Sequence, residues 1–73
     1  MAQLTHTQYD ALERAVVNGT RIIVRRTGRR ESILIPLSLG IREGREAIEA
    51  RNPTTGHEMR IYLDEVDGIE VVR

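Results

Sequence analysis

The fold is decided by residues 21–41, which read RIIVRRTGRRESILIPLSLGI. Two runs rich in Ile, Val and Leu stand on either side of a polar segment that contains Thr27-Gly28. β-Branched residues are typical of strands, and two such runs joined by a glycine-containing turn predict a hairpin. We therefore expect one strand over Arg21–Arg26 and a second, longer strand over Glu31–Ile41.

The second run is long for a single strand, and it contains Pro36 and Gly40. A proline within a sheet favours a bend or an edge position, and a glycine within a strand favours a kink. Such features are typical of the strongly curved strands of small barrels. We therefore expect this strand to bend rather than to lie in a flat sheet.

A helix over residues 5–18 is predicted upstream of the hairpin. Thr5 and Gln8 have the spacing of a capping box, and Leu4 and Tyr9 have the spacing of a hydrophobic staple. Apolar residues then recur at helical intervals, at Tyr9, Leu12 and Val16. The helix should end at Asn18-Gly19, because glycine readily adopts the left-handed conformation that follows a last helical turn.

Turn-forming residues divide the rest of the chain into three short runs. Glu43-Gly44 predicts a tight turn, and residues 52–56, NPTTG, predict a loop. The polar segment 64–67 is typical of a 3₁₀ turn, with Asp64 as its cap. Further strands are expected at Glu46–Ala50, Glu58–Leu63 and Ile69–Val72. The short connections favour an antiparallel meander.

Length and composition limit the class of protein. With 73 residues the chain has room for one domain, 1–73, and its core must be aliphatic because Phe and Trp are absent. The absence of Cys excludes disulfides and thiolate metal sites. No apolar run approaches the ~20 residues of a membrane helix, and no signal-peptide pattern is present, so we expect no membrane contact and a cytoplasmic location. Met1 and the helix start favour a complete protein.

The eleven Arg residues balance eleven acidic residues, so the net charge does not indicate a nucleic-acid partner. The distribution of the charges is more informative, because Arg25, Arg26, Arg29 and Arg30 surround the first hairpin turn. Four guanidinium groups there could bind a phosphate backbone or an acidic protein. Alternatively, they keep an exposed hairpin soluble. Strand alternation sends Arg25 and Arg26 to opposite faces, so the four need not form one surface.

A second candidate site lies on the fourth predicted strand. Tyr62 could stack on a base, and Arg60, two residues earlier, would share its face and could contact phosphate. Ile61 and Leu63 point to the opposite, buried face by the same alternation. The alternative interpretation is a packed tyrosine on the less buried side of the sheet.

Nothing in the sequence predicts catalysis, a metal or a cofactor. The two histidines, His6 and His57, have no nearby ligand to complete a metal set. The glycines at positions 40 and 44 enclose no lysine of a phosphate-binding loop. No nucleophile stands beside a base, and we therefore expect a non-enzymatic protein.

The order of helix, two longer strands, two shorter strands, 3₁₀ turn and last strand is similar to Sm-like and SH3-like barrels. Within this group the chain resembles WYL domains, most clearly in Pro36-Leu37-Ser38-Leu39 and in the closing Leu63-Asp64-Glu65-Val66. The resemblance implies a five-stranded barrel, mainly β with one N-terminal helix. It also implies a sensing module of bacterial transcription or defence regulation that binds a nucleotide or nucleic acid.

The chain departs from the WYL pattern at the positions that name the family. Glu46-Ala47-Ile48 stands where WYL domains have Trp-Tyr-Leu, and Tyr62 and Glu65 stand where the family often has Arg. Two hypotheses follow. The first is a regulatory module that binds single-stranded nucleic acid or a nucleotide through Arg25, Arg26, Arg29, Arg30, Arg60 and Tyr62. The alternative is an accessory or inhibitory protein, bacterial or phage, that binds another protein.

Self-association is a separate expectation. Sm-like barrels can join edge to edge, and the last predicted strand, residues 69–72, is a candidate for such pairing. A homo-oligomer formed through strand edges is therefore possible from the sequence.

Overall fold

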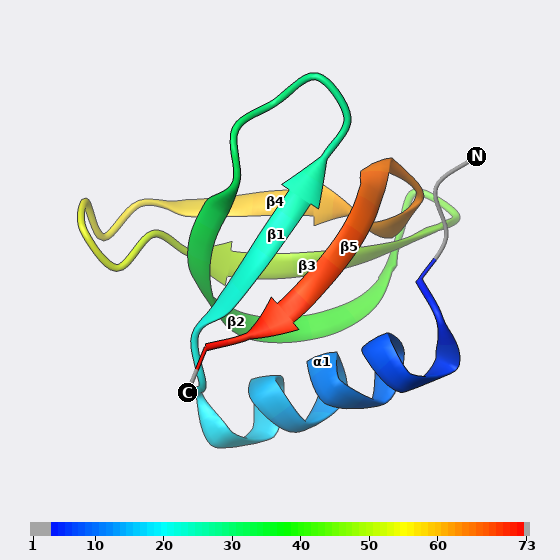
Figure 1. Cartoon of the computed structure of the whole chain (residues 1–73), viewed down its shortest axis with the longest axis horizontal. Coiled ribbons are helices and arrows are strands. Elements are labelled where there is room, and N and C mark those ends of the chain that lie inside the picture. The colour runs from blue at the N-terminus through cyan, green and yellow to red at the C-terminus, as the bar shows by residue number, and fades with distance from the viewer. Residues whose placement is uncertain (1–3, 73) are drawn as a thin grey trace.

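The structure is a computed structural model that describes residues 4–72, and in this part of the chain one helix precedes five strands (Figure 1). The elements are α1 (His6–Asn18), β1 (Ile22–Arg26), β2 (Ser32–Arg42), β3 (Arg45–Arg51), β4 (Glu58–Tyr62), the 3₁₀ turn η1 (Leu63–Glu65) and β5 (Val66–Val71). The predicted fold class, mainly β with one N-terminal helix, is confirmed. Within residues 4–72, no helix has the length and apolar character needed to cross a membrane.

Helix α1 begins and ends as its sequence predicts. The Thr5 hydroxyl accepts a hydrogen bond from the Gln8 backbone N–H at 3.1 Å, and the Gln8 side chain accepts one from the Thr5 N–H at 3.0 Å. This reciprocal capping box satisfies two backbone donors that the helix itself leaves without partners. At the other end, Gly19 adopts the left-handed conformation, with φ of 66°.

The five strands form one antiparallel sheet in the order β4-β3-β2-β1-β5. Strands β1 to β4 follow one another as a meander, but β5 returns to pair with β1 rather than with β4. The simple meander expected from the short connections is therefore wrong for the last strand. The pairings within residues 4–72 leave the sheet open between β4 and β5, so the structure shows a curved sheet and not a closed barrel.

Strand β2 explains how the sheet curves. Its first residues pair with β1, and from Ile35 onward it pairs with β3, so one strand belongs to both halves of the sheet. The register of the β2–β3 ladder shifts between Pro36 and Ser38. An extra residue in one strand bends it and increases its twist, which agrees with the bend predicted at Pro36. Pairing continues through Gly40 without a further shift.

The core lies between α1 and the sheet. Leu12 and Ala15 bring the apolar face of the helix against β2 and β5. The other members of this buried cluster are Ile22, Val24, Leu34, Ile48, Ala50, Ile61, Leu63, Val66 and Ile69. No polar or charged residue of the described chain belongs to the buried class. The fold therefore rests on aliphatic packing, as the composition predicts.

The segment between β4 and β5 differs from its sequence-based prediction. The 3₁₀ turn comprises only Leu63–Glu65, and β5 already begins at Val66. Val66 is fully buried and pairs with Arg26, so burial and strand pairing outweigh the polar character of its neighbours. The prediction that Asp64 caps the turn is wrong, because no side chain caps η1.

Candidate functional site

The loop between β1 and β2, residues 27–31, positions the arginines of the first candidate site. It opens with a tight turn in which the Arg29 N–H donates to the Arg26 carbonyl at 3.1 Å. Gly28 has a φ of 74°, which L residues with a side chain rarely adopt. The Thr27 hydroxyl donates to the Asp67 carboxylate, which ties the turn to β5. The turn is thus tied to β5 on one side, and its tip projects away from α1 (Figure 1).

Arg25 already has two acidic partners. Its Nε donates to Glu31 Oε2 at 2.5 Å, and its Nη2 lies 3.6 Å from Glu70 Oε1. The hydrogen bond to Glu31 is the main cause of a raised pKa of the Arg25 guanidinium. A ligand that contacts Arg25 would have to compete with these carboxylates, so Arg25 is a weak candidate for binding.

The other three hairpin arginines have no ion pair within residues 4–72. Arg29 and Arg30 are exposed in the loop. Arg26 is half-buried, on the same side of β1 as the buried Val24. Its Nε is buried and has no hydrogen-bond acceptor among residues 4–72. The predicted alternation of Arg25 and Arg26 agrees with this arrangement.

Arg60 and Tyr62 are held by a different set of contacts on the outer face of β3 and β4. Arg60 Nε donates to Glu49 Oε1 at 2.8 Å, and Glu49 also lies 3.4 Å from Arg42. The Tyr62 hydroxyl donates to Glu43 Oε2 at 2.6 Å. These contacts occupy the Tyr62 hydroxyl and the Nε of Arg60, and they place a carboxylate beside the Arg60 guanidinium.

The ring of Tyr62 is also covered. The Arg45 guanidinium carbon lies 3.8 Å from the ring centroid, in the geometry of a cation–π contact. Arg45 in turn donates to both carboxylate oxygens of Asp64, at 2.8 and 2.6 Å, and to Glu65 at 3.2 Å. The hydrogen bond from Arg45 holds the pKa of Asp64 below its usual value. One face of Tyr62 is therefore not free to stack on a base.

The six predicted residues fall into two groups in the strand order. Arg25, Arg26, Arg29 and Arg30 lie on or after β1, beside β5, whereas Arg60 and Tyr62 lie on β4 at the other end of the strand order. Arg45 and its acidic partners were not predicted from the sequence. The Glu43-Gly44 turn predicts that Arg45 lies at the start of the third strand. The contact between Arg45 and Tyr62, however, depends on the β3–β4 register.

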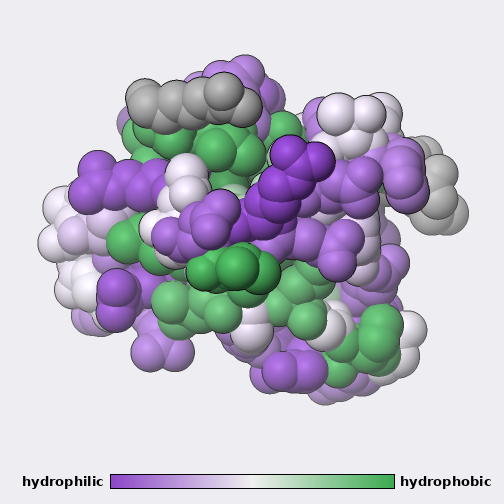
Figure 2. All heavy atoms as spheres, turned by 90° about the horizontal axis from the view of Figure 1, so that it is seen from below, coloured by the Kyte–Doolittle hydropathy of each residue, from purple (hydrophilic) through white to green (hydrophobic). Residues whose placement is uncertain are grey.

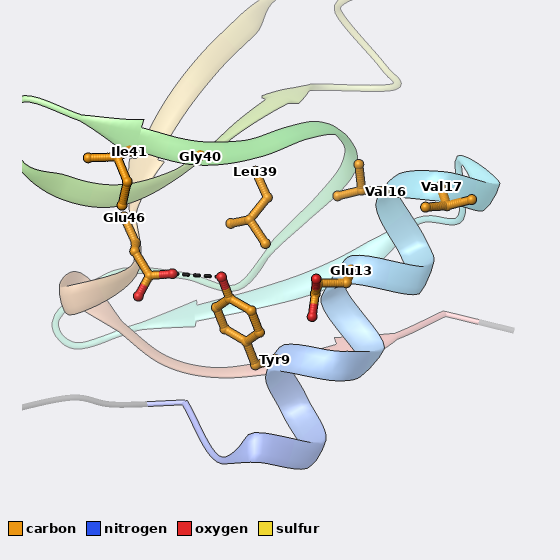
Figure 3. Close-up of a pocket in the computed structure, with 8 residues that line it drawn as sticks. All are labelled: Tyr9, Glu13, Val16, Val17, Leu39, Gly40, Ile41 and Glu46. Atoms are coloured by element: carbon orange, nitrogen blue, oxygen red, sulfur yellow. Dashed lines mark hydrogen bonds between the residues drawn. The ribbon is translucent and has the colours of Figure 1, made fainter.

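A groove between α1 and the β2–β3 hairpin was not predicted (Figure 3). Its volume is about 340 Å³, and we call it the α1–β2 groove. It is lined by Tyr9, Glu13, Val16, Val17, Leu39, Gly40, Ile41 and Glu46. The sequence predicts Tyr9 only as part of the helix, in its staple and on its apolar face, because the position of β3 opposite the helix follows from the tertiary fold.

Tyr9 and Glu46 meet across this groove. The Tyr9 hydroxyl donates to Glu46 Oε2 at 2.6 Å (Figure 3). This hydrogen bond, then burial and the charges of Glu46 and Glu13, raise the pKa of Tyr9 to about 12. The phenol therefore stays protonated at neutral pH and remains a donor.

Within residues 4–72, no group of three or more potential metal ligands comes together. Comparison with known proteins matches the chain to no protein-family model, to no curated protein and to no solved structure. The resemblance to WYL domains therefore stays a prediction.

Proposed function

We propose that this protein is a non-enzymatic binding module that holds the phosphate backbone of single-stranded nucleic acid on its β1–β2 hairpin. Arg26, Arg29 and Arg30 carry the proposal, because these neighbouring cations have no acidic partner within the described residues. Arg25, Arg60 and Tyr62 are not part of it, since each already has a partner in the fold.

The geometry supports an anionic ligand for two reasons. A guanidinium can donate two parallel hydrogen bonds to a phosphate, which suits the exposed Arg29 and Arg30. The buried Nε of Arg26 has no acceptor in the part of the chain that the structure describes, and an unmatched buried donor is unfavourable. Binding of a phosphate oxygen would remove that cost once the Arg26 side chain turned outward, because its Nε is buried in the structure. The ligand class also agrees with the regulatory role that the WYL resemblance implies.

The test is a fluorescence titration of labelled single-stranded RNA and DNA with the full chain at low and at moderate salt. The informative variant is Arg29→Gln/Arg30→Gln. Its matched control is Arg14→Gln/Arg51→Gln. This variant removes two exposed arginines from other parts of the surface, and neither has an ion pair within residues 4–72.

We expect the hairpin variant to lose about tenfold or more in affinity. The slope of the logarithm of the binding constant against the logarithm of the salt concentration should become shallower by about 1.4, which two phosphate contacts contribute on a single strand. The control should bind almost as the wild type does. Absence of binding at low salt, or equal losses in the two variants, would reject the hairpin as the site.

A further inference from the structure

The α1–β2 groove exposes aliphatic side chains on two sides. Val17, near the end of α1, is 83% exposed, and Ile41, near the end of β2, is 60% exposed. They are the two most exposed large apolar residues within positions 4–72. Isolated apolar residues on a surface are ordinary, but two that line the same hollow, with Leu39 and Val16 between them, form a surface that a partner can cover.

The same groove carries acidic groups that no arginine within residues 4–72 neutralises. Glu13 and Glu46 both line it, and neither belongs to an ion pair within the described residues. Elsewhere on the molecule the carboxylates of Glu31, Glu49 and Asp64 lie against arginines. The raised pKa of Tyr9 agrees with a negative potential at this point.

The shape and the charge together define the occupant. We propose that the α1–β2 groove binds a protein segment in which an apolar side chain stands beside Lys or Arg. The apolar side chain would lie over Leu39, between Val17 and Ile41, and the cation would meet Glu13 and Glu46. A volume of about 340 Å³ is at the small end of ligand pockets, which run from about 300 to 1,000 Å³, and it suits one or two side chains.

Charge complementarity disfavours the other occupants. Nucleic acids, acidic peptides and anionic lipid surfaces would be repelled by the two carboxylates.

Figure 2 shows the face of the molecule that carries α1, where apolar atoms lie in patches among hydrophilic side chains. The groove lies beside α1, away from the β1–β2 loop at the other end of the molecule (Figure 1). Peptide binding in the α1–β2 groove therefore does not depend on nucleic-acid binding at the β1–β2 hairpin.

The test uses the full, isotope-labelled chain and three short synthetic peptides, followed by amide chemical shifts. One peptide alternates Leu with Lys, the second alternates Leu with Glu, and the third alternates Ser with Lys. We expect saturable binding of the Leu/Lys peptide alone, with the largest shifts in the second half of α1 and in residues 39–46. Binding of the Leu/Glu peptide with equal affinity, shifts centred elsewhere, or no binding of any peptide would overturn the proposal.

Two variants test separately the apolar surface and the negative charge of the groove. Ile41→Ser removes apolar surface and Glu13→Gln removes a negative charge. Each should lower the affinity for the Leu/Lys peptide by about tenfold. Ile33→Ser is the matched control, because Ile33 is also an exposed isoleucine of β2, at 51%, and does not line the groove. An equal loss in Ile33→Ser would overturn the proposal.

A further variant tests whether the peptide binds in the α1–β2 groove or at the β1–β2 hairpin. Arg29→Gln/Arg30→Gln should bind the Leu/Lys peptide as the wild type does, whatever its effect on nucleic acid. A comparable loss of peptide binding in that variant would place the peptide at the hairpin and reject the groove.

Discussion

Tyr9 is a residue at which the helix, the sheet and the groove meet. Its ring packs against the core cluster, and its hydroxyl reaches Glu46, which lies 37 positions further along the chain. The hydrogen bond exists only while the phenol is protonated. The same contact therefore stabilises the fold and shapes the floor of the groove.

The raised pKa of Tyr9, to about 12, predicts a dependence on alkaline pH. The protonated form is favoured in the folded state over an unfolded pKa of about 10, so the stabilisation is complete below about pH 10 and is lost as the pH rises through about 12. In a Tyr62→Phe background, phenolate absorbance should give a Tyr9 midpoint near 12. Glu46→Gln should lower it. A midpoint near 10 with Glu46 intact would contradict the hydrogen bond.

The Thr5 cap of α1 should contribute measurably to the stability of the fold. Thr5→Ala removes the acceptor for the Gln8 N–H and should lower the free energy of unfolding by about 1 kcal/mol. Urea unfolding followed by circular dichroism measures this change. Thr7→Ala is the control, because Thr7 is exposed inside α1 and caps nothing. Equal losses in the two variants would mean that the cap contributes no specific stability.

At the level of elements, α1 is held by its apolar face rather than by its charges. Leu12 and Ala15 are buried against the sheet, while the acidic and basic residues of the helix face outward. An isolated helix of this length is marginal in water. Its stability must therefore come from packing on β2 and β5.

Leu12→Ala should lower the free energy of unfolding by about 2 to 5 kcal/mol, since Leu12 is fully buried. The total stability of so small a domain is of the same order, so thermal unfolding should shift markedly or be lost. Val17→Ala, on the same helix but 83% exposed, should change little. Similar stabilities of the two variants would show that α1 does not pack as described.

At the level of the whole molecule, the open edges of the sheet decide self-association. Strands β4 and β5 are the outer strands, and each has a second edge without a strand partner in the described residues. Both are short, and they carry charged side chains such as Arg60 and Glu70. Short, charged edge strands resist pairing with another chain.

We therefore expect a monomer of 8.3 kDa at micromolar concentration, and light scattering measures this directly. A larger mass that rises with concentration would favour the edge-to-edge assembly that the sequence allows. In that case a proline within β5, at a position whose N–H points outward, should restore the monomer, because proline cannot donate to a ladder.

Local features of the fold could be predicted because their causes act within a few residues. The capping box at Thr5, the end of α1 at Gly19 and the tight turn at Glu43-Gly44 depend on backbone groups that are close in sequence. Glu43 and Gly44 both have positive φ, as a two-residue hairpin turn of type I′ requires. Each strand was therefore placed to within one residue, except the start of β5.

The candidate site was only partly predictable. The cluster of arginines around Gly28 is visible in the sequence, but whether each is free depends on carboxylates that other strands bring to it. Glu70 reaches Arg25 from β5, and Glu49 reaches Arg60 from β3. These partners are set by the register of the sheet, and a register cannot be derived from side-chain spacing along one strand.

The sequence by itself determined the helix, the hairpins, the bend at Pro36 and the aliphatic composition of the core. Only the tertiary structure decided that β5 pairs with β1, that Arg25 and Arg60 are neutralised, and that Val17 and Ile41 enclose an acidic groove. The physical reason is the range of the interactions. Caps and turns satisfy neighbouring backbone groups, whereas ion pairs and grooves form between residues that approach one another only after the sheet has curved.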